Sequence, residues 1–294
     1  MPELPEVEVV RRGIEPYLSG ATLHNVEVHH ERVARRFAGT ADDLARQLEG
    51  QTVTTVERRG KYLWATLGED TRSILFHLGM SGQILVDENH LPQRAHTRLH
   101  AQIGADTFLS FVDQRTFGYV TIDNLVPTVS TLDPTIVRFV PSLAAHIAPD
   151  LLEPAFDLEE VARTIRSRRV PIKTALLNQE IVSGIGNIYA DEALWQARVH
   201  AARLASGLSY ATIREILQAA QEVMQRALNV GGTSFDNLYV NAAGEPGYFA
   251  RSLAAYGKAG TPCPRCQSLL ERCVVGGRSH TYCPNCQKVP RRNR

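Results

Sequence analysis

The chain opens with Met-Pro-Glu-Leu-Pro-Glu-Val-Glu, residues 1–8, and the rest of the sequence is organised around this stretch. A small second residue normally permits removal of the initiator methionine, so we expect Pro2 to carry a free secondary amine. An α-amino group has a pKa of about 8, so roughly a tenth is neutral and nucleophilic at pH 7. Amine nucleophiles form covalent Schiff-base intermediates, and Pro2 is therefore a candidate nucleophile with Glu3 and Glu6 close by in sequence.

The same stretch predicts a helix that starts near Pro5 and ends near Gly20. Its apolar positions repeat with a helical period, and acidic residues occupy the first turn, where they complement the helix dipole. The apolar positions are Val7, Val10 and Ile14. The charged positions are Glu6, Glu8, Arg11 and Arg12. The simpler interpretation is that both prolines only mark the start of this helix.

Length and composition limit the class of protein. A chain of 294 residues with 44% hydrophobic residues can form one large or two ordinary domains with a packed core. No apolar run reaches about 18 residues, and the acidic N-terminus lacks a signal-peptide core. We therefore expect a cytoplasmic protein without a membrane span.

The charge distribution is more informative than the net charge of +1. Residues 251–294 contain nine Lys or Arg and one acid, and residues 163–173 contain five Lys or Arg and no acid. Local basic faces on a nearly neutral protein favour a partner that carries phosphates. Any single cluster, taken alone, is better explained as a solvated surface.

The N-terminal half alternates apolar and polar residues in short segments separated by Gly, Asp and Asn, a pattern typical of a β-sandwich. One short helix is expected at 41–48. The expected strands are 22–28, 52–57, 62–67, 73–78, 83–86, 99–103, 108–112 and 119–122.

Two positions in this half carry possible chemistry. Lys61, at the start of a strand, could hold a phosphate or transfer a proton, or could be an ordinary strand-edge lysine. Met80 lies in the Gly-rich loop 79–82, where it could form an exposed apolar wedge or fold onto the core.

Prolines and acids are frequent in residues 124–156, which we interpret as a hinge with local turns. Helices are expected beyond it at 158–166, 172–179, 187–197 and 209–228, with Asp157 and Ser209 as caps. Between the middle two lies the tight turn Ser183-Gly184-Ile185-Gly186. Asn187 could cap the following helix or donate to a phosphate at its N-terminus.

Four cysteines form two close pairs, Cys263/Cys266 and Cys283/Cys286, with the spacing C-x2-C-x16-C-x2-C. This spacing predicts a tetrahedral zinc site with four thiolate ligands and therefore a structural role. Because the surrounding module is too small for its own core, the metal is expected to stabilise it. Cys273 lies between the pairs and is spare.

These motifs occur in the same order as in bacterial formamidopyrimidine-DNA glycosylases, which the chain resembles over residues 1–288. That family excises oxidised purines and then cuts the strand by β,δ-elimination. The resemblance implies Pro2 as nucleophile, Glu3 and Glu6 as its acidic partners, Lys61 as a catalytic DNA contact, and Arg278 on the phosphate beside the lesion. It also implies further contacts to double-stranded DNA through His77, Met80, His96, Arg115, Phe117 and Asn187.

Two segments depart from the family pattern. The family has Asp-Pro-Arg-Arg-Phe-Gly at residues 113–118, whereas this chain has Gln114 and Thr116. Met80, Arg115 and Phe117, which fill the gap left by a flipped nucleotide in the family, are retained. The loop 231–249, which closes over the flipped base in the family, has Phe235-Asp236-Asn237 where a Lys or Arg is frequent.

The resemblance implies an α+β protein of two domains that acts as a monomer. Residues 1–130 form a β-sandwich with an N-terminal helix, 131–150 a linker, 151–250 a helix–two-turn–helix domain with the lesion-capping loop, and 251–294 a zinc-finger β-hairpin. Three alternatives remain. They are an endonuclease VIII-type enzyme for oxidised pyrimidines, disfavoured by Leu4 and the three gap-filling residues, a non-catalytic DNA-binding zinc protein, and a zinc-ribbon adaptor.

Overall fold

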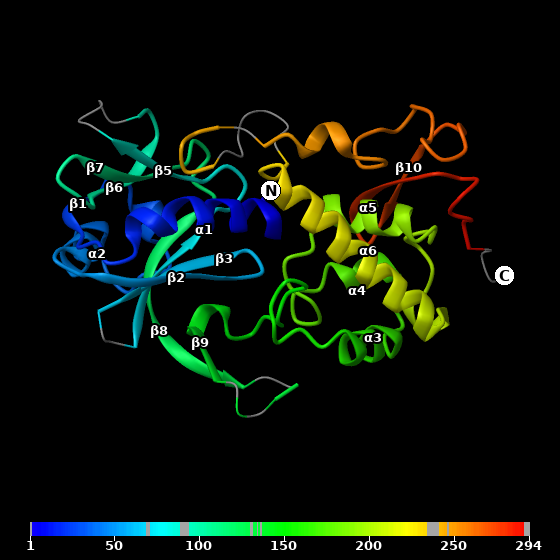
Figure 1. Cartoon of the computed structure of the whole chain (residues 1–294), viewed down its shortest axis with the longest axis horizontal. Coiled ribbons are helices and arrows are strands. Elements are labelled where there is room, and N and C mark those ends of the chain that lie inside the picture. Colours follow the sequence, from blue (N-terminus) through cyan, green and yellow to red (C-terminus); the bar gives the residue numbers. More distant parts are fainter. Residues whose placement is uncertain are drawn as a thin grey trace. The chain divides into compact units, whose positions relative to one another are not determined.

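The computed structural model describes residues 2–68, 71–88, 94–129, 132–133, 135, 137–233, 241–245 and 247–290 (Figure 1). The chain divides into two compact units. The first contains Met1–Ser130, Thr135–His146 and Leu228–Ala250, and the second contains Thr131–Pro134, Ile147–Ala227 and Arg251–Arg294.

Two antiparallel sheets build the first unit (Figure 1). One has the strand order β1-β6-β7-β5 and the other β2-β3-β4-β8-β9. The strands of the first sheet are β1 (His24–Val28), β5 (Gln83–Glu88), β6 (Thr97–Gln102) and β7 (Thr107–Val112). Those of the second are β2 (Val53–Arg59), β3 (Tyr62–Leu67), β4 (Arg72–His77), β8 (Tyr119–Val129) and β9 (Val137–Pro141).

One hydrophobic core joins both sheets to helices α1 (Leu4–Leu18) and α2 (Ala41–Leu48). Val7, Val10 and Ile14 of α1 are almost completely buried in it, as the helical period predicts. Leu63 of one sheet and Phe111 of the other belong to the same cluster. The predicted β-sandwich with an N-terminal helix is therefore confirmed.

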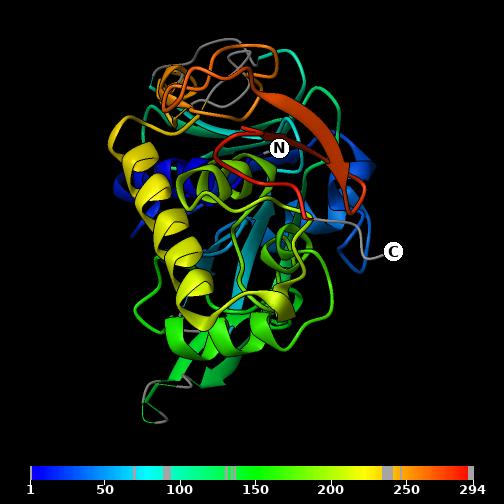
Figure 2. The ribbon, with the colours of Figure 1, turned by 90° about the vertical axis from the view of Figure 1, so that its right-hand side faces the viewer.

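The second unit is helical and ends in a hairpin. It contains α3 (Leu158–Arg166), α4 (Ile172–Leu176), α5 (Asn187–Gln196), α6 (Tyr210–Asn229, whose last residues group with the first unit), β10 (Glu271–Val275) and β11 (Arg278–Tyr282). Asp157 caps α3 by accepting from the N–H groups of Glu159 and Glu160, as predicted. The long helix α6, yellow in Figure 2, begins beside α3, where Arg214 pairs with Glu159 at 2.9 Å.

Short 3₁₀ turns complete the described structure. They are η1 (Glu31–Ala34), η2 (Ser142–Ala144), η3 (Ala205–Gly207) and η4 (Phe249–Ser252). Over the described residues, we find no helix that combines the length and the apolar character needed to cross a bilayer.

The expected hinge contains regular structure that the sequence pattern did not predict. β8 continues to Val129, and β9 pairs with it antiparallel within residues read as turns. The prolines in this segment favour turns in a reading of the sequence alone. In the structure, Pro127 pairs with Phe139 of β9, and it lies beyond Asn124, the last β8 residue that pairs with β4. A proline is tolerated there, since one side of this two-stranded extension needs no N–H donor.

Residues 228–250 group with the β-rich unit and not with the helical segment to which the sequence pattern assigned them. Ala242 is buried in the first unit's core, and its carbonyl accepts from Val86 N–H at 2.9 Å. A Cβ added to Gly13 of α1 would lie 2.8 Å from Ala242 Cβ, so the glycine permits this approach. A single small residue in a polar loop gives no sequence signal for such a contact.

Candidate functional site

The residues at the start of α1 and just before it form a buried acidic cluster. Glu3 and Glu6 are 3% and 5% exposed, and Pro2 is also buried. The backbone N–H of Glu3 donates to Glu6 Oε2 at 2.8 Å, and that of Thr233 donates to Glu6 Oε1 at 2.9 Å. Both carboxylate oxygens of Glu6 therefore hold backbone in place, a geometry suited to orienting the N-terminus.

Thr233 follows two glycines that fix the base of the loop 231–249. Gly231 and Gly232 have φ of +79° and +81°, a backbone conformation that residues with a side chain rarely adopt. On the segment that returns from the loop, Phe249 N–H donates to Gly232 O at 3.0 Å, and a Cβ at Gly247 would lie 2.3 Å from the same oxygen. Two segments thus close tightly beside Glu6. Residues 235–237, which stand where the family often has a Lys or Arg, lie outside the described residues.

A small cavity of about 10 Å³ adjoins Pro2, roughly the space of one water molecule. Its lining includes Glu6 and Gly231, and also Leu78 and Gly82 from the loop after β4. The candidate nucleophile and the loop that carries Met80 therefore belong to one neighbourhood of the first unit.

His77 lies in an aromatic row across three neighbouring strands. Its register partners are Tyr62 on β3 and Tyr119 on β8, and its ring stacks on Tyr119 with centroids 5.3 Å apart. Burial, together with the charges of Lys61, Arg35 and Arg36, lowers the pKa of His77 to about 4. Gly79 N–H donates to Nδ1, so the neutral ring keeps its proton on Nε2 and offers a donor.

The three predicted gap-filling residues lie on two loops in direct contact. Met80 and Phe117 are 40% and 39% exposed, although both are large and apolar. The guanidinium of Arg115 lies 4.9 Å from the Phe117 ring centroid. A Cβ at Gly79 would lie 2.5 Å from the Phe117 carbonyl carbon, so the loops touch through their backbones. The structure brings the three residues together as an exposed apolar and cationic group.

His96 stands beside the same group and is exposed, with φ +67°. Its carbonyl accepts from Asp113 N–H at 3.1 Å. Lys61 is half-buried at the turn before β3, within electrostatic reach of His77. The first unit thus carries every predicted site residue except Asn187, Arg278 and the cysteines.

In the second unit, Asn187 and Arg278 lie on adjacent elements. Gly186 occupies the N-cap of α5 without a side-chain cap, so Asn187 is the first helical residue and not the cap. Asn187 Nδ2 donates to Ser279 Oγ at 3.2 Å, and Arg278 is the exposed residue before Ser279. Within the described chain, Asn187 Oδ1 is buried without a hydrogen-bond partner.

A buried network that the sequence pattern did not predict fixes this hairpin to α5. Asp191 Oδ1 lies 2.5 Å from Lys173 Nζ and 2.7 Å from His280 Nδ1, and Thr281 N–H donates to Oδ2 at 3.0 Å. Lys173 is 0% exposed, so it does not belong to the basic surface expected at 163–173, whereas Arg163, Arg166, Arg168 and Arg169 are exposed. In the sequence, Lys173 is distinguished only by its position in a run of basic residues.

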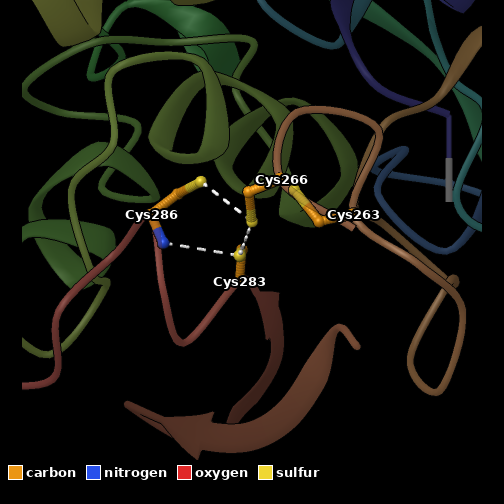
Figure 3. A group of neighbouring side chains, drawn as sticks. All are labelled: Cys263, Cys266, Cys283 and Cys286. Carbon is orange, nitrogen blue, oxygen red and sulfur yellow. Dashed lines mark hydrogen bonds between the residues drawn. The ribbon is translucent and has the colours of Figure 1, made fainter. Parts of the chain in front are cut away.

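The four paired cysteines converge from the loops on either side of the β10–β11 hairpin (Figure 3). All four Sγ atoms lie within 4.8 Å of one another, and Cys266 Sγ is 3.4 Å from Cys283 Sγ. Tetrahedral zinc with Zn–S of about 2.3 Å places its sulfur ligands about 3.8 Å apart, so this donor set fits one zinc ion. Cys273 lies within β10 and is not part of the cluster.

Comparison with known proteins agrees with this arrangement. Residues 1–120 match the formamidopyrimidine-DNA glycosylase N-terminal domain, residues 147–238 its H2TH domain, and residues 260–289 the zinc finger found in FPG and IleRS. The formamidopyrimidine-DNA glycosylase of Rhodococcus jostii (strain RHA1) is 51% identical over 293 residues, 100% of this chain and 98% of that protein. That of Corynebacterium jeikeium (strain K411) is 50% identical over 282 residues, 95% of this chain and 97% of that protein.

Solved structures of formamidopyrimidine-DNA glycosylases are also similar to this chain over almost its full length. The Lactococcus lactis Fpg in complex with DNA containing an abasic site is 30% identical, with a TM-score of 0.82 over 98% of this chain and 100% of that one. A MutM complex with DNA containing carbocyclic 8-oxo-G is 31% identical, with the same TM-score and coverage. With its fold, its cysteine cluster and full-length relatives all in agreement, the chain belongs to the formamidopyrimidine-DNA glycosylase family.

Proposed function

We propose that this chain is a bifunctional DNA glycosylase and AP lyase that removes oxidised purines in base excision repair, with Pro2 as its nucleophile. The observation that carries the proposal is the buried group of Pro2, Glu3 and Glu6, in which Glu6 bridges the N-terminal backbone and Thr233. A structural helix start would not need a carboxylate linked across 227 residues of sequence.

The proposed reaction begins after removal of Met1. The Pro2 nitrogen attacks C1′ of the damaged nucleoside, the bond to the base breaks, and Glu3 donates a proton as the sugar ring opens. The resulting iminium acidifies the C2′ proton. Its loss expels the 3′ phosphate, a second elimination expels the 5′ phosphate, and hydrolysis of the iminium releases Pro2. Glu6 orients the N-terminus throughout.

We propose that the remaining site residues bind the DNA. Neutral His77 offers Nε2–H to a phosphate oxygen, and Lys61 adds a charge close to it. His96 is suited to a backbone contact because it is exposed beside the gap-filling group. In the second unit, Asn187 and Arg278 would hold the phosphates next to the lesion, and zinc bound by the four cysteines would stabilise the hairpin that presents Arg278.

Met80, Arg115 and Phe117 are proposed to occupy the space left by the flipped nucleotide. Unstacking and unpairing a base costs a few kcal/mol, which an exposed apolar and cationic group can offset by filling the gap. We further propose that the enzyme acts as a monomer in the cytoplasm, where cysteine thiolates remain available to zinc.

The substrate class is tested with a panel of duplexes that carry one defined lesion each. We expect excision of 8-oxoguanine and formamidopyrimidines to be at least tenfold faster than that of oxidised pyrimidines. Glu3→Gln serves as the control, because it keeps the amine but removes the acid. A preference for oxidised pyrimidines would identify endonuclease VIII-type specificity instead.

A further inference from the structure

Asp113 is a fully buried carboxylate that joins the two loops of the gap-filling group. Its exposure is 0%. Oδ1 accepts from Ser81 Oγ at 2.6 Å and from Arg115 N–H at 3.1 Å, and Oδ2 accepts from Gly118 N–H at 2.7 Å. An ionised group tolerates such burial only when several donors compensate for lost water. Here those donors belong to the residues that flank Met80 and Phe117.

The Asp113 backbone extends the same connection. Its N–H donates to His96 O at 3.1 Å, and its carbonyl accepts from Arg98 Nε at 2.9 Å. His96 and the gap-filling loops therefore share one anchoring residue.

A second set of contacts holds the far side of the loop. Arg35 donates from Nη1 to Gly118 O at 2.5 Å and from Nη2 to Phe117 O at 2.7 Å. Between these anchors, Thr116 is buried with φ +52°, a left-handed conformation that is unusual for a β-branched residue. Strain of this kind persists only where the surroundings over-determine the backbone.

We infer that Asp113 is a positioning residue that locks Met80, Arg115 and Phe117 into one preformed wedge. The inference rests on the proposed function, because it assigns a cause to the speed of base flipping. A wedge held in place before binding loses little conformational entropy when it enters the helix, so more of its contact energy lowers the barrier to flipping. Because Asp113 is fully buried, it acts through these three residues and not through a contact of its own with the DNA.

Asp113→Asn tests the inference, because it keeps the size of the side chain but replaces one acceptor oxygen with a donor. We expect single-turnover excision of 8-oxoguanine from a duplex to slow at least tenfold. Cleavage of a preformed abasic site should change by less than threefold, since the free-energy cost of flipping is already partly relieved at such a site. The rise of 2-aminopurine fluorescence beside the lesion, which reports unstacking, should slow as much as excision does.

Asp123→Asn is the matched control. Asp123 also accepts from a serine hydroxyl and a backbone N–H, those of Ser142 and Leu143, both at 2.7 Å, but it lies away from the wedge. We expect this variant to lose stability while keeping its excision rate within twofold of the parent. An equal loss of excision in both variants, or an unchanged rate in Asp113→Asn, would overturn the inference.

If Asp113→Asn does not fold, a double-mutant cycle with Ser81→Ala and Phe117→Ala takes its place. The hydroxyl of Ser81 is the side-chain link from the Met80 loop to Asp113, so its loss should slow excision in the parent but add little once Phe117 is absent. Additive effects would show that the two loops act independently and would contradict the inference. Failure of the unmutated protein to excise 8-oxoguanine at all would instead refute the proposed function.

Discussion

At the residue scale, the groups of the site are held together over very different distances along the chain. Pro2, Glu3 and Glu6 fall within six residues, and the cysteine pairs have a metal-ligand spacing. Asp191 gave no signal, because its partners Lys173, His280 and Thr281 lie far from it along the chain. Asp113 stands in the motif 113–118 with two of its donors, but its link to Ser81 lies 32 residues away. From the sequence alone, an exposed loop aspartate cannot be distinguished from a buried one such as Asp113, which is 0% exposed.

Glu8 provides a test of the electrostatics at this scale. Burial alone would raise the pKa of Glu8, but hydrogen bonds and charges from Arg11, Arg58 and Arg12 outweigh it and lower the pKa to about 2. A carboxyl group with a depressed folded-state pKa stabilises the fold above its unfolded pKa of 4.5. That contribution is lost as the pH falls from about 4.5 to about 2.

Glu8→Gln should therefore lower the free energy of unfolding by roughly 2 kcal/mol at pH 7, and by progressively less below pH 4.5. Urea denaturation at several pH values measures this. Glu15→Gln is the control, because Glu15 pairs with Arg11 at 2.9 Å but is 47% exposed, so its loss should cost about 0.5 kcal/mol or less. A pH-independent deficit in Glu8→Gln would contradict the account.

At the element scale, hydrophobic periodicity predicted the helices and most strands, whereas proline-rich segments were misread. The strand 62–67 and the helix 41–48 have the predicted bounds, because each presents a regular apolar face to the core. β9 was missed because its pairing partner is a proline-containing extension of β8. α4 ends at Leu176, three residues before the predicted end.

The glycine pair at the base of the loop 231–249 also acts at this scale. Gly232 has φ +81°, and a Cβ there would lie 3.4 Å from Glu6 Oε1. Gly232→Ala should displace Glu6 or Thr233 and slow excision at least tenfold, because Glu6 would no longer hold the N-terminus. Gly20→Ala shares the backbone strain, with φ +84°, but meets no atom within 4 Å. Single-turnover rates equal in both variants would mean that strain alone, and not the contact with Glu6, matters.

At the scale of the whole molecule, the proposed chemistry and the proposed phosphate contacts belong to different compact units. Pro2, Glu6 and the wedge lie in the first, whereas Asn187, Arg278 and the cysteine cluster lie in the second. The chain order hides this division, since residues 228–250 follow a helical segment but pack with the first unit. The predicted domain 151–250 includes this segment, whereas the compact unit that contains it is the first.

Zinc tests the contribution of the second unit. Cys283→Ser should lower the zinc content and weaken DNA binding at least tenfold, because the hairpin that carries Arg278 loses its support. Cys273→Ser should leave both unchanged, since Cys273 stands apart from the cluster. Elemental analysis and DNA-binding titrations measure the two quantities. Full zinc occupancy in Cys283→Ser would rule out this ligand set.

The proposed reaction requires the amine of Pro2 to form the covalent intermediate. Pro2→Gly keeps an amine, although a primary one with altered geometry, so slow reaction can survive. A protein with additional uncleaved residues before Pro2 has no amine at this position, but it keeps Asn187, Arg278 and the cysteine cluster and should still bind DNA.

Borohydride trapping on a duplex that contains 8-oxoguanine measures this most directly, because borohydride reduces an iminium to a stable protein–DNA adduct. The unextended protein should form an adduct that maps by mass spectrometry to the N-terminal peptide lacking Met1, and the extended protein should form none. An extended protein that traps DNA at the full rate would assign the nucleophile to a lysine such as Lys61 and contradict the account.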